Sequence, residues 1–103
     1  MHTIRVSLER ELFRWAGVTT RPIFGLPGYI VNGKVFALLV TGGIILTKLP
    51  ESERELISKR FPTVPVTGHG GVIAAWVQVR IPETGDLSTI LPFAKKSFNE
   101  AAR

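Results

Sequence analysis

Residues 23–49, IFGLPGYIVNGKVFALLVTGGIILTKL, constrain the fold more than any other stretch of the chain. Two turn signals, Asn32-Gly33 and Gly42-Gly43, separate three apolar runs. Asn-Gly accepts the positive φ angles that a type I′ turn needs at both central positions, and Gly-Gly can do the same. The pattern therefore predicts a three-stranded antiparallel meander over residues 29–31, 34–41 and 44–49.

The middle run, residues 34–41, is apolar on both of its faces. In a regular strand the side chains alternate between two sets, Val35, Ala37 and Leu39 on one face and Phe36, Leu38 and Val40 on the other. Strands of this kind are normally covered on both faces. We expect helices of this chain to cover one face, and a partner subunit is a candidate for the other.

Helical patterns flank the meander. The first covers residues 7–16, with Ser7 as N-cap, Trp15 on its apolar face and Gly17 as the stop. Residues 18–28 are rich in Pro and Gly and are expected to be an irregular lead-in to the meander. A second helix is predicted over residues 50–61, where Ser52 and Glu55 have the spacing of a capping box.

The C-terminal half adds strands and one more helix. Residues 63–66 are predicted to be a short edge strand, because Pro65 cannot donate to a ladder. Residues 72–81 alternate as a strand with one apolar and one mixed face. A helical pattern then covers residues 87–102, with Pro92 in conflict. Either a helical turn precedes Pro92, or the helix begins there with Pro92 as its first residue, and we favour the second.

Together these elements predict a single α+β domain over residues 1–103. We expect a two-layer sandwich in which helices pack on one face of an antiparallel meander sheet of four or five strands. The second face of the meander and the mixed face of residues 72–81 are left without a cover. An apolar face of this kind is a candidate interface.

The composition restricts the function. Thirteen Lys and Arg against eight Asp and Glu give a net charge of +5, which attracts nucleic acid, acidic proteins and anionic lipid alike. The absence of cysteine excludes disulfides, thiolate metal sites and a cysteine nucleophile. Neither a signal peptide nor an apolar run of roughly 20 residues is present, so we expect a cytoplasmic protein with no membrane partner.

Candidate catalytic and metal-binding residues are few. Gly68-His69-Gly70-Gly71 lacks the Gly-Lys-Ser/Thr of a phosphate-binding loop, and the chain has no G-x-S-x-G nucleophile motif. His69 and His2 do not make a zinc or iron site. The glutamates around Glu53 lie at a predicted helix start, where the helix dipole favours negative charge. The first predicted helix carries Arg10 and Arg14 beside Glu9 and Glu11, so it is not an acidic surface that would bind iron. We expect no cofactor, no metal and no enzymatic activity.

Basic residues next to aromatic ones suggest a nucleic-acid site. Arg80 shares a strand face with Trp76, whose indole either packs in the sheet or an interface or stacks on bases. Lys95 and Lys96 lie on the polar side of the last helix. The candidate nucleic-acid-binding residues are Arg21, Lys34, Arg80, Lys95 and Lys96.

VTTRPIFGLPGYIVNGKVFALLV, residues 18–40, resembles the N-terminal domain of the TfoX (Sxy) family. The positions that match its motif are Phe24, Gly25, Tyr29, Gly33, Lys34, Phe36 and Ala37. ILTKLPESERELI and the Trp76-containing AAWVQVRIP look like its next strand and helix and its last strand, so the resemblance covers residues 8–102. The layout and the fragment GHGG…WVQVRI are also similar to the related MmcQ/YjbR family.

The resemblance implies a layout like those of type III secretion chaperones and frataxin. TfoX proteins regulate natural competence in bacteria and carry a second, helical domain, which we expect to be absent because the chain ends at Arg103. The first hypothesis is therefore a non-catalytic regulatory or adaptor domain of the TfoX type, which acts by binding a protein partner or by forming a homodimer. The alternative is a nucleic-acid-binding module of the MmcQ/YjbR type.

Overall fold

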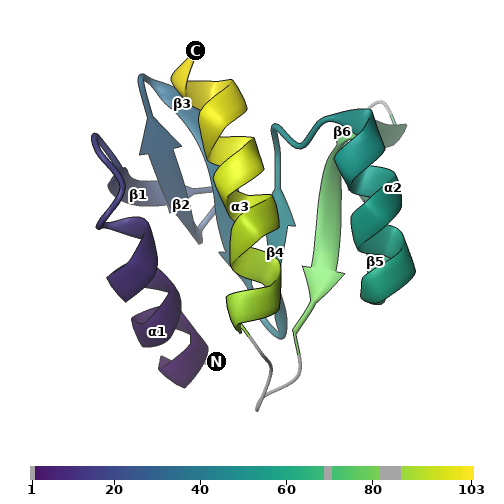
Figure 1. Cartoon of the computed structure of the whole chain (residues 1–103), viewed down its shortest axis with the longest axis horizontal. Helices are drawn as coiled ribbons and strands as arrows, with labels where there is room; N and C mark the ends of the chain where they lie inside the picture. Colours follow the sequence, from purple (N-terminus) through teal and green to yellow (C-terminus); the bar gives the residue numbers. More distant parts are fainter. Residues whose placement is uncertain (1, 69–70, 82–86) are drawn as a thin grey trace.

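The computed structural model describes residues 2–68, 71–81 and 87–103 of the chain. These residues form three helices and six strands, and the strands make one antiparallel sheet in the order β1-β2-β3-β4-β6-β5 (Figure 1). The elements are α1 (His2–Leu12), β1 (Thr19–Ile23), β2 (Leu26–Val31), β3 (Lys34–Val40), β4 (Gly43–Leu46), α2 (Glu51–Arg60), β5 (Thr63–Gly68), β6 (Gly71–Arg80) and α3 (Leu87–Ala102). The predicted α+β class and antiparallel meander are confirmed, but the sheet has six strands instead of four or five.

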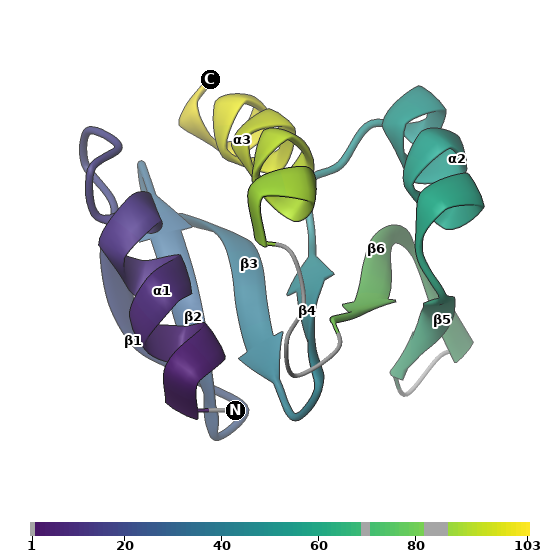
Figure 2. The same cartoon turned by 60° about the horizontal axis from the view of Figure 1, so that its bottom comes forward.

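All three helices lie on the same side of the sheet (Figure 2). In this view α1 lies beside β1 and β2, α3 lies above the centre of the sheet, and α2 lies on the side of β5 and β6. The core fills the space between the two layers, with Leu8 and Leu12 from α1, Ile57 from α2, and Ile90 and Ala94 from α3 all fully buried. The other side of the sheet carries no helix of the described chain. We call it the helix-free face.

The segment predicted to be irregular, residues 18–28, instead forms most of the β1–β2 hairpin. Its two prolines, Pro22 and Pro27, pair with each other near the hairpin tip. Proline is tolerated at both places because β1 is an edge strand, and because β2 begins to pair with β3 only at Gly28. The prediction followed from the Pro and Gly content of the segment, which does not reveal whether a neighbouring strand needs the missing N–H groups.

A β-bulge in β3 changes the predicted division of its side chains. Tyr29 pairs with Ala37 and Ile30 pairs with Val35, so Phe36 is an extra residue in β3. Phe36 packs on the helix side, where its ring contacts Phe98 at 5.5 Å between centroids. Phe36 therefore shares a face with Ala37, and the prediction that placed them on opposite faces is wrong. The bulge also moves Val35, which pairs with Ile30, away from the face of Ala37.

A serine of α3 holds the bulged strand in place. The Ser97 hydroxyl is fully buried, donates to the Phe36 carbonyl oxygen at 2.7 Å and accepts from the Lys48 N–H at 3.0 Å. The Thr47 N–H donates to the same Phe36 carbonyl oxygen at 3.2 Å. Ser97 thus connects α3 to β3 and to the segment that follows β4.

The helix boundaries differ from the prediction at three places. α1 covers His2–Leu12 instead of residues 7–16, so Ser7 lies inside the helix, where an Arg5–Glu9 ion pair of 3.0 Å spans it. α2 has Pro50 at its N-cap with no side-chain cap, so the predicted capping box does not form. α3 runs through Pro92 from Leu87, because the full burial of Ile90 stabilises the first turn.

The last two strands agree with the prediction. β5 is an edge strand that contains Pro65, and it extends to Gly68. Val77 and Val79 of β6 face the core, while Gln78 pairs with Ile45 on the helix-free face. Among the described residues, no helix is both long enough and apolar enough to cross a membrane.

Replacing Ser97 by Ala should destabilise the fold, because the buried bond to the Phe36 carbonyl oxygen is lost and the part-buried Lys48 N–H loses its acceptor. The expected loss is about 1 to 3 kcal/mol, or roughly 4–8 °C in melting temperature for each kcal/mol. Ser58→Ala is the matched control, since the Ser58 hydroxyl is exposed and bonds only within α2. Denaturant unfolding of both variants provides the measurement, and equal effects would contradict the role given to Ser97.

Candidate functional site

A row of paired residues crosses the helix-free face from one edge of the sheet to the other. Its members are Arg21, Gly28, Leu38, Ile45, Gln78 and Val64, one from each strand. Leu38 and Ile45 are 1% and 6% exposed, yet neither belongs to the core cluster beneath the helices. The helix-free face therefore buries a small apolar centre of its own, without a helix to cover it.

An apolar groove of about 340 Å³ lies over this centre. Its floor is Leu38 and Ile45, and among the lining side chains only Thr67 and Trp76 carry a polar atom. The lining residues are Phe24, Leu26, Leu38, Ile45, Val66, Thr67, Ile73 and Trp76. One wall thus comes from the β1–β2 hairpin and the other from β5 and β6. Trp76 is partly buried in the second wall, and its role, whether packing in the sheet or an interface or stacking on bases, stays a prediction.

Phe24 is the most exposed large apolar residue among those described, at 84%. It occupies the first central position of the two-residue β1–β2 turn, with a φ of 54°, and Gly25 follows with a φ of 76°. A positive φ is costly for a bulky residue. The exposed ring makes no compensating burial within the chain, so local stability does not account for this phenylalanine.

The next turn of the same sheet provides an internal comparison. Asn32 and Gly33 have φ angles of 53° and 75°, the same as those of Phe24 and Gly25 to within a degree. Asn-Gly is the favoured sequence for this geometry. The chain therefore uses the favoured residue at one turn and a strained aromatic residue at the other, and the aromatic one lies beside the groove. Strained, exposed residues of this kind cluster at functional sites.

The strands carry no acidic residue. Their only charged side chains are Arg21 in β1, Lys34 in β3 and Arg80 at the end of β6, all cationic. The described acidic residues all lie on the three helices. The two layers therefore differ in charge as well as in secondary structure.

The structure separates the five predicted nucleic-acid-binding residues. Arg21 and Arg80 lie on the helix-free face, since Arg21 belongs to the row and Arg80 follows Gln78 by two positions. Lys34 pairs with Val31 of the core, so its side chain leaves the strand on the helix-bearing side of the sheet. Lys95 and Lys96 are on α3. The five residues therefore do not form one patch.

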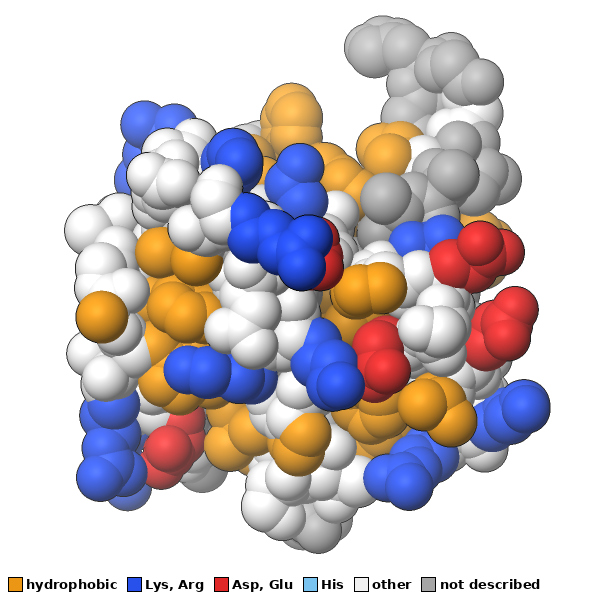
Figure 3. All heavy atoms as spheres, turned by 45° about the horizontal axis from the view of Figure 1, so that its top comes forward, with side chains coloured by type: hydrophobic (Ala, Val, Ile, Leu, Met, Phe, Trp, Pro, Cys, Tyr) orange, Lys and Arg blue, Asp and Glu red, His pale blue; other side chains and the backbone are white. Residues whose placement is uncertain are grey.

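The two α3 lysines already have partners. The Lys95 ammonium lies 4.7 Å from the Trp15 ring centre and 4.6 Å from that of Phe98, a cation–π arrangement. Lys96 forms an ion pair of 3.7 Å with Glu53 of α2. Figure 3, which looks obliquely at the helix-bearing side, shows basic and acidic side chains intermixed. Lys95 and Lys96 are therefore engaged within the chain instead of being free for a nucleic-acid backbone.

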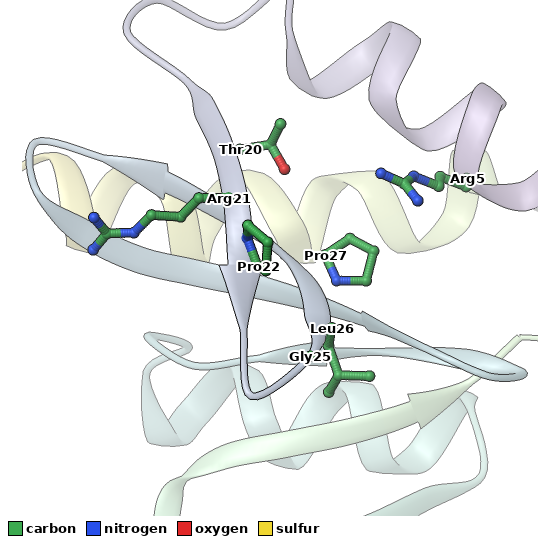
Figure 4. Close-up of a pocket in the computed structure, with 7 residues that line it drawn as sticks. All are labelled: Arg5, Thr20, Arg21, Pro22, Gly25, Leu26 and Pro27. Carbon is green, nitrogen blue, oxygen red and sulfur yellow. The ribbon is translucent and has the colours of Figure 1, made fainter.

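A second hollow, of about 350 Å³, lies between α1 and the β1–β2 hairpin (Figure 4). Arg5 extends towards it, whereas Arg21 extends away from it. The Arg5 guanidinium is occupied by Glu9, whose carboxylate also accepts the Tyr29 hydroxyl at 2.7 Å. This network attaches α1 to the sheet and pairs Arg5, one of the two arginines in the lining, whereas the other, Arg21, forms no ion pair with the described residues.

The catalytic candidates receive little support from the described residues. His69 and its neighbour Gly70 lie outside them. Within residues 2–68, 71–81 and 87–103, no three His, Asp or Glu side chains gather as metal ligands would. The expectation that the chain is not an enzyme stays a prediction.

Comparison with protein families, with curated protein sequences and with solved structures finds no match to this chain. The resemblance drawn from residues 8–102 therefore stays a prediction as well. Sequence reasoning had singled out Phe24, Gly25, Gly33, Phe36 and Trp76 as motif or structural residues. It missed that Phe24 and Trp76 line one groove, although the Phe-Gly pair between two prolines was a signal for a second type I′ turn.

Tyr29 should make the fold sensitive to alkaline pH. Burial raises the pKa of Tyr29 above its ordinary value of 10.0, and the hydrogen bond to Glu9 raises it further. Because the folded pKa is raised, this contribution to stability is complete below pH 10.0 and is lost as the pH rises through the folded pKa. The stability advantage of the wild type over Tyr29→Phe should therefore shrink only above pH 10.

Tyrosinate absorbance provides a direct measurement, because Tyr29 is the only tyrosine in the chain. We expect absorbance to rise together with unfolding, as followed by circular dichroism. Ionisation at an ordinary pKa while the chain stays folded would contradict the role of the Glu9–Tyr29 contact.

Replacing Phe24 by Asn should stabilise the isolated chain by an amount on the order of 1 kcal/mol, because Asn tolerates the positive φ that strains Phe. The reciprocal variant Asn32→Phe is the matched control, since its turn has the same geometry, and it should be destabilised by a similar amount. Thermal unfolding of both variants tests the argument. A loss of stability in Phe24→Asn would mean that the ring serves the fold after all.

Proposed function

We propose that this chain is a non-catalytic regulatory or adaptor domain that binds another protein through the helix-free face of its sheet. The observation that carries the proposal is Phe24, which is 84% exposed, strained in its backbone and adjacent to an apolar groove. Buried aromatic anchors contribute much of the affinity at protein interfaces, usually beside well-packed pockets. Phe24 and Trp76 supply such aromatic groups on the two walls of one groove.

The face of the sheet suits this role better than its edges. The outer strands each contain a proline, Pro22 in β1 and Pro65 in β5, and β5 is also irregular between Pro65 and Thr67. Prolines and bulges prevent a further strand from pairing at an edge. A partner that used the sheet would therefore contact its side chains instead of its backbone.

The resemblance to the TfoX N-terminal domain supports a regulatory role of this kind, in competence or in transcription. In that proposal the chain is one cytoplasmic domain, and its helices on one side of a sheet correspond to a secretion-chaperone-like or frataxin-like layout. Such layouts leave a sheet face free for a partner, which includes a second copy of the chain.

A nucleic-acid-binding module of the MmcQ/YjbR type is the second candidate. It is favoured by the position of Arg21, Arg80 and Trp76 on one sheet face, because cations and an aromatic ring together bind single strands. Lys34, Lys95 and Lys96 would not take part in such a site, since they start from the other side of the sheet.

Photo-crosslinking distinguishes these candidates. p-Benzoylphenylalanine replaces Phe24 in one variant and Leu56 in a control, since Leu56 is also apolar and is 46% exposed, but lies on α2. Both variants are irradiated in the cells that naturally produce the protein. We expect a protease-sensitive adduct at position 24 that is absent at position 56.

Each other result contradicts part of the proposal. A nuclease-sensitive adduct at position 24 would favour the nucleic-acid module, and an equal adduct at both positions would show that the helix-free face is not special. No adduct at position 24 would overturn the proposal. An adduct with twice the mass of the chain would identify the partner as a second copy.

A further inference from the structure

We infer that the partner presents an acidic, amphipathic helix whose apolar side chains enter the groove of the helix-free face. The inference rests on the proposed function and names the chemistry of the partner. It combines three features of the same face: an apolar centre, cations around that centre, and edges that reject another strand.

Two cations of the helix-free face, Arg21 and Arg80, lie outside the lining of the groove, one on β1 and one on β6. Arg21 is two strands from Leu38 within the same row, and adjacent strands are about 4.8 Å apart. Arg80 lies two positions beyond Gln78, the residue that pairs with Ile45. Both arginines are exposed, and neither forms an ion pair within the described part of the chain. Carboxylates on either side of an apolar anchor would meet these free guanidinium groups.

A second copy of the chain fits this face less well. Two copies packed face to face would bring Arg21 and Arg80 of each copy into one interface with no acidic side chain on either sheet, and each chain carries a net charge of +5. Like charges at an interface suppress association. Within the described part of the chain, the acidic residues that could relieve the repulsion lie on the helices of the opposite layer.

Nucleic acid shares the negative charge but not the apolar character. The groove floor is aliphatic, with Leu38 and Ile45, and among the lining side chains only Thr67 and the indole N–H of Trp76 could pair with the polar edges of a base. Polar groups that lose water without gaining a partner weaken binding. Leucine-like or phenylalanine-like side chains have no polar groups that would lose water on entering the groove.

A helix is the element that the face can accept. Pro22 and Pro65 obstruct strand addition at both edges, as argued above, whereas a sheet face is normally covered by helices. α3 shows how this works on the other layer, where Ile90, Ala94 and Phe98 are buried at a spacing of four residues. A partner helix with apolar residues at that spacing and Asp or Glu beside them would turn the two layers into three.

Peptide display tests the inference without knowledge of the partner. A random library of peptides of about 16 residues, a helical length of about 24 Å, is selected on the wild-type chain and depleted on Phe24→Asn. We expect the enriched peptides to be acidic, with apolar residues three and four positions apart. Their affinity should fall as salt is raised, because salt screens exposed charges.

Charge reversal at matched positions completes the experiment. For an enriched peptide, Arg21→Glu and Arg80→Glu should each weaken binding roughly tenfold at low salt, while Lys34→Glu should not, because Lys34 starts from the other face. Equal weakening by Lys34→Glu would overturn the inference, as would enrichment of basic, uncharged or unpatterned peptides.

The outcome separates the inference from the proposed function. If position 24 crosslinks to a protein but selection yields no acidic amphipathic peptide, the inference fails and the association role stands. A crosslink to a second copy or to nucleic acid also overturns the inference, whatever the peptides show. If position 24 crosslinks to nothing, both fail.

Discussion

The bulge at Phe36 is the constraint on which both layers depend. Because β3 contains one extra residue there, Phe36 and Ala37 both face the helices, and Leu38 is left for the opposite face. The Phe36 ring contacts Phe98 of α3 and Trp15 in the turn that follows α1, with ring centres 5.5 and 6.2 Å away. Ser97 holds the Phe36 carbonyl oxygen from above. One inserted residue thus divides an apolar strand between the core and the groove.

Local sequence signals were sufficient for elements whose stability is local. The Asn32-Gly33 turn, α2 and the alternating β6 follow from turn chemistry and periodicity, and all three are present. The bulge could not be predicted in the same way, because Phe36 and Ala37 suit either face and only packing against Phe98 decides between them. The β1–β2 hairpin was not predicted for a related reason. Pro22 and Pro27 suggested an irregular segment, but a proline disrupts a strand only where a neighbouring strand requires its N–H.

The candidate site was predicted in parts but not assembled. Phe24, Trp76, Arg21 and Arg80 were all identified from the sequence, yet the two arginines were grouped with lysines that lie on the other side. A face assignment needs the pairing of every intervening strand, and a single extra residue in β3 reverses it for the residues before the bulge. The row from Arg21 through Leu38 to Gln78 exists only once that register is known.

The helix-free face combines a buried apolar centre, which needs no partner, with one exposed aromatic ring that can contact a partner. Leu38 and Ile45 are nearly inaccessible without a helix above them, so the sheet does not depend on a partner for its apolar centre. The exposed apolar surface is concentrated in Phe24, at a turn where Asn would cost the fold less. Obligate partners bury large apolar faces that cannot stay open in water. A small groove with one exposed aromatic ring, Phe24, and two unpaired arginines instead suits a transient complex. We therefore regard the proposed complex as a reversible one.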